Sequence, residues 1–219
     1  MHYNINQDII IKSENAAKSN FQPNKYVLDY FKGINNMDLV LDYGCGKLRY
    51  TIPLCNLAGR VIAIDSEEQI TRTQKIWEEK TSIIEYSDRI SNLKVYSIRE
   101  DKWKNYKYDF ILCSNILSAI PYDSERFEVL KNIKELLNYK GKALITTQYR
   151  NSYFSTYESR NNTIKYHDGW LIKNKSYYSF YGLINTERLV GYCNEAGLSI
   201  EKIVIHDGSS FITVSSLLK

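Results

Sequence analysis

The stretch that most constrains this chain is residues 39–49, where a short apolar run leads into a turn that contains two glycines. Leu39 to Leu41 has the composition of a buried parallel strand. Gly44 and Gly46 follow it one residue apart, and glycine adopts backbone angles that a side chain forbids. The pattern predicts a strand that ends in a loop wrapped closely around a ligand.

A second apolar strand is predicted at residues 61–64, and it ends in Asp65, nineteen residues after Gly46. A carboxylate at the end of the next strand can accept hydrogen bonds from the hydroxyl groups of a ribose. The dinucleotide-binding fingerprint also requires a third glycine, but residues 47–49 read Lys-Leu-Arg. A nucleotide site is therefore predicted, and a dinucleotide site is disfavoured.

The Asp42-x-Gly44-x-Gly46 pattern resembles the first motif of class I S-adenosylmethionine-dependent methyltransferases. The order of predicted elements over residues 23–218 is similar to that family as well. The resemblance implies an α/β fold, in which a three-layer, doubly wound, seven-stranded sheet is mostly parallel and ends in a C-terminal antiparallel hairpin. It also implies that S-adenosylmethionine is the cofactor.

Apolar spacing and turn residues predict the other elements of such a sheet. Pro53 removes a backbone donor, so the helix after the glycine turn is expected to begin late, near Thr51. A helix that begins at Asp123 is expected to end before Gly141. Its inner stripe is expected to comprise Phe127, Leu130, Ile133 and Leu137. The remaining expected elements are a helix at 23–31, strands at 93–98, 108–113 and 143–147, a helix at 185–196 and a hairpin at 200–214.

A further helix is predicted directly after Asp65. Ser66 and Gln69 have the spacing of a capping box, and two acidic residues between them favour the first turn of a helix. The buried face of this helix is expected to comprise Ile70, Thr73 and Trp77.

One domain is expected to span residues 1–219, a length that can bury a sizeable core. Residues 1–22 are predicted to form an N-terminal arm or a short helix that helps to enclose the acceptor. Residues 148–184 are too many for a simple connection between a strand and a helix, so they are expected to fold over the site as a substrate lid. Residues 164–172 of this lid, around the Asp168-Gly169 pair, read as a hairpin.

The predicted lid is crowded with aromatic and basic side chains. Aromatic groups interleaved with cations can stack on bases and pair with phosphates. They can equally cover a small aromatic acceptor, or pack mainly on one another. The sequence leaves these three interpretations open.

The resemblance implies which residues hold the cofactor. Gly44 and Gly46 would shape the loop on the methionine side, and Asp65 would hold the ribose. Ligands in open α/β sheets bind at the carboxyl ends of the strands, where Ser114 lies. The full set expected to bind the cofactor is Asp42, Gly44, Cys45, Gly46, Asp65, Ser66, Ile98, Arg99, Glu100, Cys113 and Ser114.

The acceptor is expected to contact Asn115, Tyr149, Arg150 and Tyr178. His167 is a candidate catalytic residue, because a neutral imidazole can take the proton of a hydroxyl acceptor. A lone histidine beside a turn is also often an ordinary surface residue. Methyl transfer mainly requires positioning, so no obligatory nucleophile or metal is expected.

The residues after the fourth predicted strand disfavour two DNA-base chemistries. Methyltransferases that act on exocyclic amino groups of DNA bases carry an Asp/Asn-Pro-Pro-Tyr turn at this point, and those that act on cytosine carbon carry a Pro-Cys nucleophile. Residues 114–117 read Ser-Asn-Ile-Leu and match neither pattern.

Composition sets weaker limits. The net charge of +4, from 29 basic and 25 acidic residues, is no nucleic-acid footprint by itself. The four cysteines and three histidines have no zinc-site spacing, so no metal is expected. No run approaches the roughly 20 apolar residues of a membrane helix, and no signal peptide is recognised, so a cytoplasmic protein without membrane partners is expected.

The sequence therefore favours a methyltransferase that moves a methyl group from S-adenosylmethionine to an oxygen or nitrogen of a small-molecule acceptor. One alternative is an RNA- or DNA-modifying methyltransferase that uses the basic aromatic lid. A second is an inactive nucleotide-binding regulator, because the bulky residues 47–49 could narrow the methionine end of the site.

Overall fold

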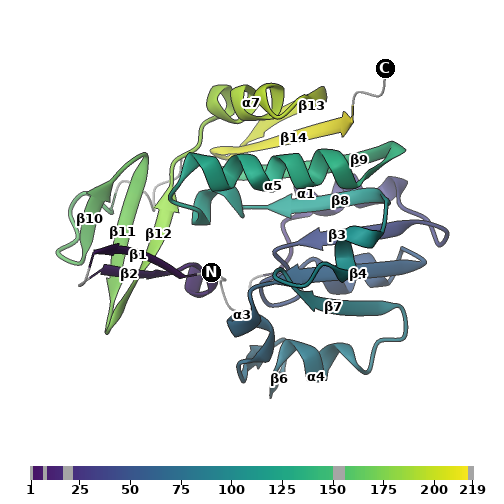
Figure 1. The fold of residues 1–219 in the computed structure, drawn as a ribbon, viewed down its shortest axis with the longest axis horizontal. Helices are drawn as coiled ribbons and strands as arrows, with labels where there is room; N and C mark the ends of the chain where they lie inside the picture. The colour runs from purple at the N-terminus through teal and green to yellow at the C-terminus, as the bar shows by residue number, and fades with distance from the viewer. Residues whose placement is uncertain (1, 7–8, 17–21, 150–155, 217–219) are drawn as a thin grey trace.

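A seven-stranded sheet forms the centre of the computed structural model, which describes residues 2–6, 9–16, 22–149 and 156–216 (Figure 1). Across the sheet the strands follow the order β13-β14-β9-β8-β3-β4-β7. β3 pairs in parallel with β4 and β8, whereas β14 is antiparallel to β9 and β13. The predicted mostly parallel sheet with a C-terminal hairpin is confirmed. The strand bounds are β3 Leu39–Tyr43, β4 Arg60–Asp65, β7 Leu93–Ser97, β8 Tyr108–Ser114, β9 Leu137–Gln148, β13 Leu198–His206 and β14 Ser209–Ser216.

Both faces of this sheet are covered, which gives three layers. Successive strand residues point to opposite faces, so Val40 and Leu41 belong to two different buried clusters. One cluster includes side chains of α5 and α7, and the other includes side chains of α1 to α4. The helices are α1 Lys25–Tyr30, α2 Thr51–Cys55, α3 Glu67–Thr71, α4 Ile83–Ser87, α5 Asp123–Leu136 and α7 Thr186–Glu195, with short 3-10 turns η1 Ser13–Ala16, η2 Phe31–Gly33, η3 Lys102–Asn105 and η4 Leu117–Ala119.

Several helix ends follow the predicted local chemistry. α2 begins at Thr51, as the position of Pro53 predicts. The Asn185 side chain caps α7 by accepting a hydrogen bond from the backbone N–H of Arg188 at 2.9 Å. Gly197, at φ +73°, follows that helix in the left-handed conformation that commonly ends helices.

The helix predicted from Ser66 to Trp77 is wrong beyond Thr71. Arg72 has an extended backbone, with ψ of 139°, and the chain then enters a hairpin of β5 (Gln74–Ile76) and β6 (Glu79–Thr81). Trp77 lies in the turn of this hairpin at φ +50° and is 36% exposed, so it is not a core residue. Thr73 is also exposed, whereas Ile70 is buried as expected.

The predicted capping box is present in part. Ser66 accepts a hydrogen bond from the backbone N–H of Gln69 at 3.3 Å, as an N-cap does. The Gln69 side chain does not complete the box, because its amide donates to the carbonyl of Gly46. A reciprocal capping box occurs instead at Ser82 and Glu85, before α4.

The inner stripe expected for α5 ends one residue early. Leu130 and Ile133 are fully buried on this helix. Leu137 is buried too, but it has an extended backbone (φ −64°, ψ 135°) and is the first residue of β9. The chain therefore passes from helix to strand without an intervening loop at this point.

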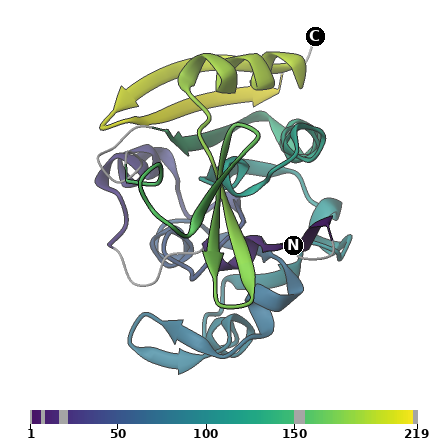
Figure 2. The same cartoon turned by 90° about the vertical axis from the view of Figure 1, so that its left-hand side faces the viewer.

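A second sheet, which we call the lid sheet, combines the N-terminal arm with the predicted lid (Figure 2). Its order is β1-β2-β12-β11-β10, and β2 pairs in parallel with β12 through Ile11 and Tyr178. The hairpin expected around Asp168 is confirmed as β10 and β11. The arm is mainly strand rather than helix. The bounds are β1 His2–Asn6, β2 Ile9–Lys12, β10 Thr163–Tyr166, β11 Gly169–Asn174 and β12 Tyr177–Gly182.

The lid sheet lies beyond the carboxyl ends of the parallel strands (Figure 1). It has a small core of its own, which consists of Tyr3, Ile11, Leu171, Tyr178 and Phe180. Some of the lid aromatics therefore pack on one another, as one of the three interpretations of this segment predicted.

Candidate functional site

A cavity of about 210 Å³ lies where β3, β4 and β8 end, between these strands and the lid sheet. This is the edge at which open α/β sheets bind ligands. The residues predicted to bind the cofactor that do line this cavity are Asp42, Gly44, Cys45, Gly46, Asp65, Ser66, Ile98 and Ser114. Asn115, predicted to contact the acceptor, lines it as well.

The loop after β3 needs glycine for two reasons. Gly44 and Gly46 have φ of +81° and +57°, in the left-handed region that side chains disfavour. A Cβ atom on Gly44 would also lie 2.1 Å from Cδ1 of Ile116, which lines the cavity. The backbone N–H of Gly44 donates to the carbonyl of Ile64 at 2.8 Å, which holds the loop against the end of β4.

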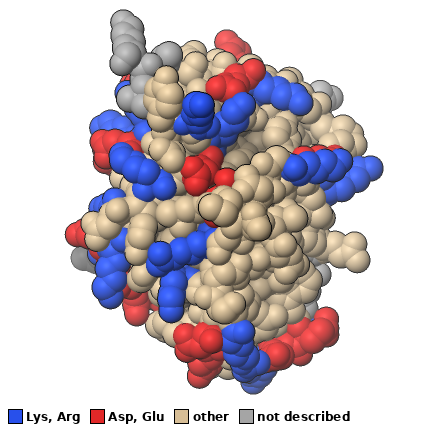
Figure 3. All heavy atoms as spheres, turned by 90° about the vertical axis from the view of Figure 1, so that its right-hand side faces the viewer, with Lys and Arg blue, Asp and Glu red and all other residues tan. Residues whose placement is uncertain are grey.

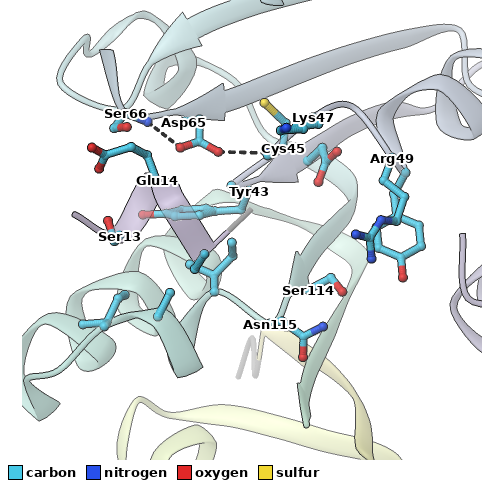
Figure 4. A pocket seen from close by; sticks show the side chains of 18 of the residues that line it. Ser13, Glu14, Tyr43, Cys45, Lys47, Arg49, Asp65, Ser66, Ser114 and Asn115 are labelled. Carbon is cyan, nitrogen blue, oxygen red and sulfur yellow. Dashed lines mark hydrogen bonds between the residues drawn. The ribbon is translucent and has the colours of Figure 1, made fainter. Parts of the chain in front are cut away.

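Asp65 joins the glycine loop to the end of β4. Its Oδ2 accepts a hydrogen bond from the backbone N–H of Gly46 at 2.9 Å, and its Oδ1 accepts one from Ser66 at 2.7 Å (Figure 4). Gln69, which is fully buried, donates from Nε2 to the carbonyl of Gly46 at 2.5 Å. The shape of the loop is thus set by residues on the neighbouring strand and helix.

Two carboxyl groups give this cavity an unusual electrostatic character. Burial raises the pKa of Asp65 to about 6, although hydrogen bonds from Gly46 and Ser66 oppose the shift. Burial likewise raises the pKa of Asp42 to about 7, against a 2.6 Å hydrogen bond from the Thr51 hydroxyl and with a further contribution from the charge of Asp65. The cavity therefore favours ligands that bring hydrogen-bond donors or positive charge.

The N-terminal arm covers this cavity, and the sequence reasoning did not identify which of its residues line it. Ser13 and Glu14 of η1 line one end, and Arg49 lies at the other (Figure 4). Glu14 is 7% exposed and its Oε1 lies 2.8 Å from Nε2 of His2. Nothing local in residues 13–16 marks a site, because the pairing of the arm with the lid brings them here. The other lining residues missed are Ala16, Tyr43, Lys47, Tyr50, Ile116, Ala119, Ile120, Gln148 and Tyr181.

Three residues predicted to bind the cofactor are not among those that line the cavity. Cys113 is fully buried in the core. Glu100 accepts a hydrogen bond from the backbone N–H of Ser97 at 3.0 Å and pairs with Lys102 at 2.9 Å, which directs it elsewhere. Arg99 follows Ile98 in the chain, but of these two only Ile98 lines the cavity.

The residues predicted for the acceptor and for catalysis are mostly elsewhere. Tyr178 belongs to the lid-sheet core, and the Tyr149 hydroxyl lies 3.5 Å from the Thr186 hydroxyl. His167 occupies the turn between β10 and β11 at φ +48°, where its ring contacts Tyr122 and Tyr166 rather than the cavity. Arg150 lies outside the described residues.

The model of a family described as a methyltransferase domain matches residues 16–203, which include the whole glycine loop and Asp65. The chain is a member of this methyltransferase family. An uncharacterized protein of Escherichia coli strain K12, YmfD, is 38% identical over 217 residues, which cover 99% of this chain and 96% of the relative.

Solved structures support the fold of this methyltransferase. A SAM-dependent methyltransferase from Methanosarcina mazei is 15% identical, with a TM-score of 0.63 over 91% of this chain and all of its own. The DhpI–SAH complex is also 15% identical, with a TM-score of 0.61, and the match covers 86% of this chain and 81% of that one. These likenesses confirm the class I fold that the sequence resembles.

Two kinds of feature are absent from the parts of the methyltransferase that the structure describes. No group of three or more His, Cys, Asp or Glu side chains is placed to hold a metal ion. None of the described helices combines the length and the hydropathy needed to cross a membrane.

Proposed function

We propose that this methyltransferase transfers a methyl group from S-adenosylmethionine to an oxygen or nitrogen of a small-molecule acceptor. The observation that carries the proposal is that the chain itself encloses the first cavity. The cavity that contains Gly44, Asp42 and Asp65 is covered by η1 and by Tyr181 of the lid sheet. A cavity covered by the chain itself suits a small acceptor better than a polymer.

In this proposal the residues around the glycine loop hold the cofactor. The loop can approach a ligand closely because Gly44 and Gly46 carry no side chains. The Asp65 carboxylate, held in place by two backbone N–H groups, would accept hydrogen bonds from the ribose hydroxyls. The raised pKa values of Asp42 and Asp65 fit a positively charged ligand, since such a ligand stabilises their ionised forms.

The chain's contribution to catalysis is positioning and the exclusion of water. When bound, S-adenosylmethionine supplies a methyl group attached to a positively charged sulfur. Asn115, which lines the cavity at φ +60°, and Ile116 would orient the acceptor against the cofactor side. η1 and the lid sheet would exclude water from the reacting groups.

The nucleic-acid alternative is less favoured, because several lid cations already stack on lid aromatics. Lys165 Nζ lies 4.8 Å from the Trp170 ring centre, and the Arg160 guanidinium lies 5.1 Å from the Tyr157 ring centre. On the face turned away from the lid, basic and acidic side chains are interspersed (Figure 3). Nucleic-acid affinity that falls steeply with salt would favour this alternative instead.

Calorimetric titration with S-adenosylmethionine and with S-adenosylhomocysteine tests the proposed cofactor residues. We expect Asp65→Ala to weaken both ligands by at least about 10-fold. The exposed Asp101, which pairs with Lys104, provides the matched control Asp101→Ala, which should bind like the wild type. Equal affinities for the wild type and Asp65→Ala would remove Asp65 from the cofactor site.

Transfer of a labelled methyl group tests the acceptor class. Purified protein would be incubated with labelled cofactor and either a metabolite extract or total RNA. Label in small molecules supports the proposal, and label in RNA supports the nucleic-acid alternative. Binding without any transfer would support the inactive regulator.

A further inference from the structure

A second cavity, of about 510 Å³, adjoins the first. Ala16, Lys47 and Tyr181 line both cavities, so a ligand in one can extend toward the other. Arg72, at the end of α3, bounds the second cavity on the side of the seven-stranded sheet, and β11 and β12 bound it on the side of the lid sheet. Apart from Ala16, Lys47 and Tyr181, the described residues that line the second cavity do not line the first.

Two cations line the second cavity, and neither has an acidic partner among the residues that the structure describes. Arg72 donates to the carbonyl of Glu14 at 3.0 Å and to the side-chain oxygens of Asn15 and Gln69, and all three acceptors are neutral. Within the described part of the chain, buried Nε of Arg72 has no hydrogen-bond partner. The Arg72 guanidinium thus retains a positive charge that none of these three acceptors neutralises.

Lys47 adds a second positive charge nearby. The pKa of Lys47 is lowered by burial and by the charge of Arg72, so the two cations repel each other. None of the described lining residues is Asp or Glu, although the first cavity contains Glu14, Asp42 and Asp65. Because the first cavity combines these three acids with Lys47 and Arg49, the second cavity attracts an anionic group more strongly than the first does.

Four of the thirteen described residues that line the second cavity are aromatic. Tyr157, Tyr177, Phe180 and Tyr181 line it. Aromatic faces favour planar ligands, which they contact by offset stacking or edge to face. The second cavity thus favours a ligand that is both planar and negatively charged.

We propose that the acceptor is a small planar acid whose carboxylate or phosphate lies between Lys47 and Arg72. This inference rests on the proposed function, and it assigns the second cavity to the acceptor rather than to the cofactor. The reacting oxygen or nitrogen would then extend past Tyr181 toward the first cavity.

The test is calorimetric titration of protein saturated with S-adenosylhomocysteine. The probes are benzoate and phenyl phosphate, with benzamide as the neutral analogue of benzoate. We expect one of the anions to bind at least about 10-fold more tightly than benzamide. The stronger of the two anions identifies the carboxylate or the phosphate as the preferred group.

Substitutions of Lys47 and Arg72 test whether the anion binds between these two residues. Lys47→Gln should weaken the preferred anion by about 10-fold in protein that is saturated with S-adenosylhomocysteine. Arg72→Gln should weaken the anion as well, but it also removes the hydrogen bonds to η1, so Lys47→Gln is decisive. Lys75→Gln is the matched control, because Lys75 on β5 is exposed and lines neither cavity.

Three results would overturn the inference. Equal binding of anions and benzamide would show that the cavity does not select charge, and absence of anion binding at about 10 mM would have the same meaning. Loss of S-adenosylhomocysteine affinity in Lys47→Gln would instead place the cofactor carboxylate there. Failure of the wild type to bind S-adenosylhomocysteine at all would contradict the proposed function, which is a separate outcome.

Discussion

The guanidinium group of Arg126, on α5, holds the carboxylate of Asp168, in the lid-sheet turn, through two hydrogen bonds of 2.6 and 3.0 Å. The Arg126 side chain is fully buried, and its Nε donates to the carbonyls of Leu117 and Ile120 at 3.1 and 2.9 Å. Ile120 lines the first cavity. One arginine therefore connects the lid sheet to the wall of the candidate site.

Replacing the bidentate partner of this arginine should destabilise the protein. Asp168→Asn leaves the buried Arg126 charge with one carboxylate partner, Asp123 at 2.9 Å, so we expect the free energy of unfolding to fall by about 1.5–3 kcal/mol. Arg188 also contacts Asp168, at 2.9 Å, but its side chain is 37% exposed, so Arg188→Gln should cost under about 1 kcal/mol. Urea denaturation measures the free energy of unfolding of both variants. Similar small losses in the two variants would show that the buried pair is not a main anchor of the lid.

The glycine loop should not tolerate a side chain at its first glycine. Gly44→Ala places a methyl group 2.1 Å from Cδ1 of Ile116 and strains a residue at φ +81°, so cofactor affinity should fall by at least about 10-fold. Gly33→Ala is the control, because a Cβ there would meet no atom within 4 Å. Adding Ile116→Ala should restore part of the affinity. Titration with S-adenosylhomocysteine reports all three effects, and wild-type affinity in Gly44→Ala would be incompatible with this close packing.

The stability of the unliganded protein should depend on pH through Asp42. Burial raises its pKa to about 7, so between about pH 4 and pH 7 the folded state retains a proton that the unfolded chain loses. The contribution of this group is thus favourable below pH 4 and is lost as the pH rises to 7. Relative to wild type, Asp42→Asn should gain roughly 2–4 kcal/mol between about pH 4.5 and pH 8. Thermal unfolding at several pH values tests this, and a pH-independent difference would contradict it.

A substitution at Trp77 distinguishes the β5–β6 hairpin from the helix that the sequence predicted for this segment. Because Trp77 lies in an exposed turn, Trp77→Ala should change the free energy of unfolding by less than about 1 kcal/mol. Trp103, which is 1% exposed, is the reference, and Trp103→Ala should cost about 3–5 kcal/mol. A comparable loss at both positions would mean that Trp77 is buried in solution.

The sequence by itself determined the features that depend on neighbouring residues. The strand at 39–43, the glycine loop and the hairpin around Asp207-Gly208 each follow from local backbone preferences, and the structure contains all three. Asp65 could be placed for a similar reason, since parallel strands end at the same edge of a sheet. The class I fold and the position of the candidate site were therefore predictable.

Tertiary structure decided the features that depend on contacts between distant residues. Glu14 reaches the cavity because β2 joins β12, where Ile11 pairs with Tyr178, 167 positions later in the chain (178 − 11 = 167). In the lid sheet, Tyr178 belongs to the core of that sheet, and His167 lies in the turn between β10 and β11. Local preferences carry no information on such pairings, because their free energy arises only when the chain is compact and the two surfaces are buried together.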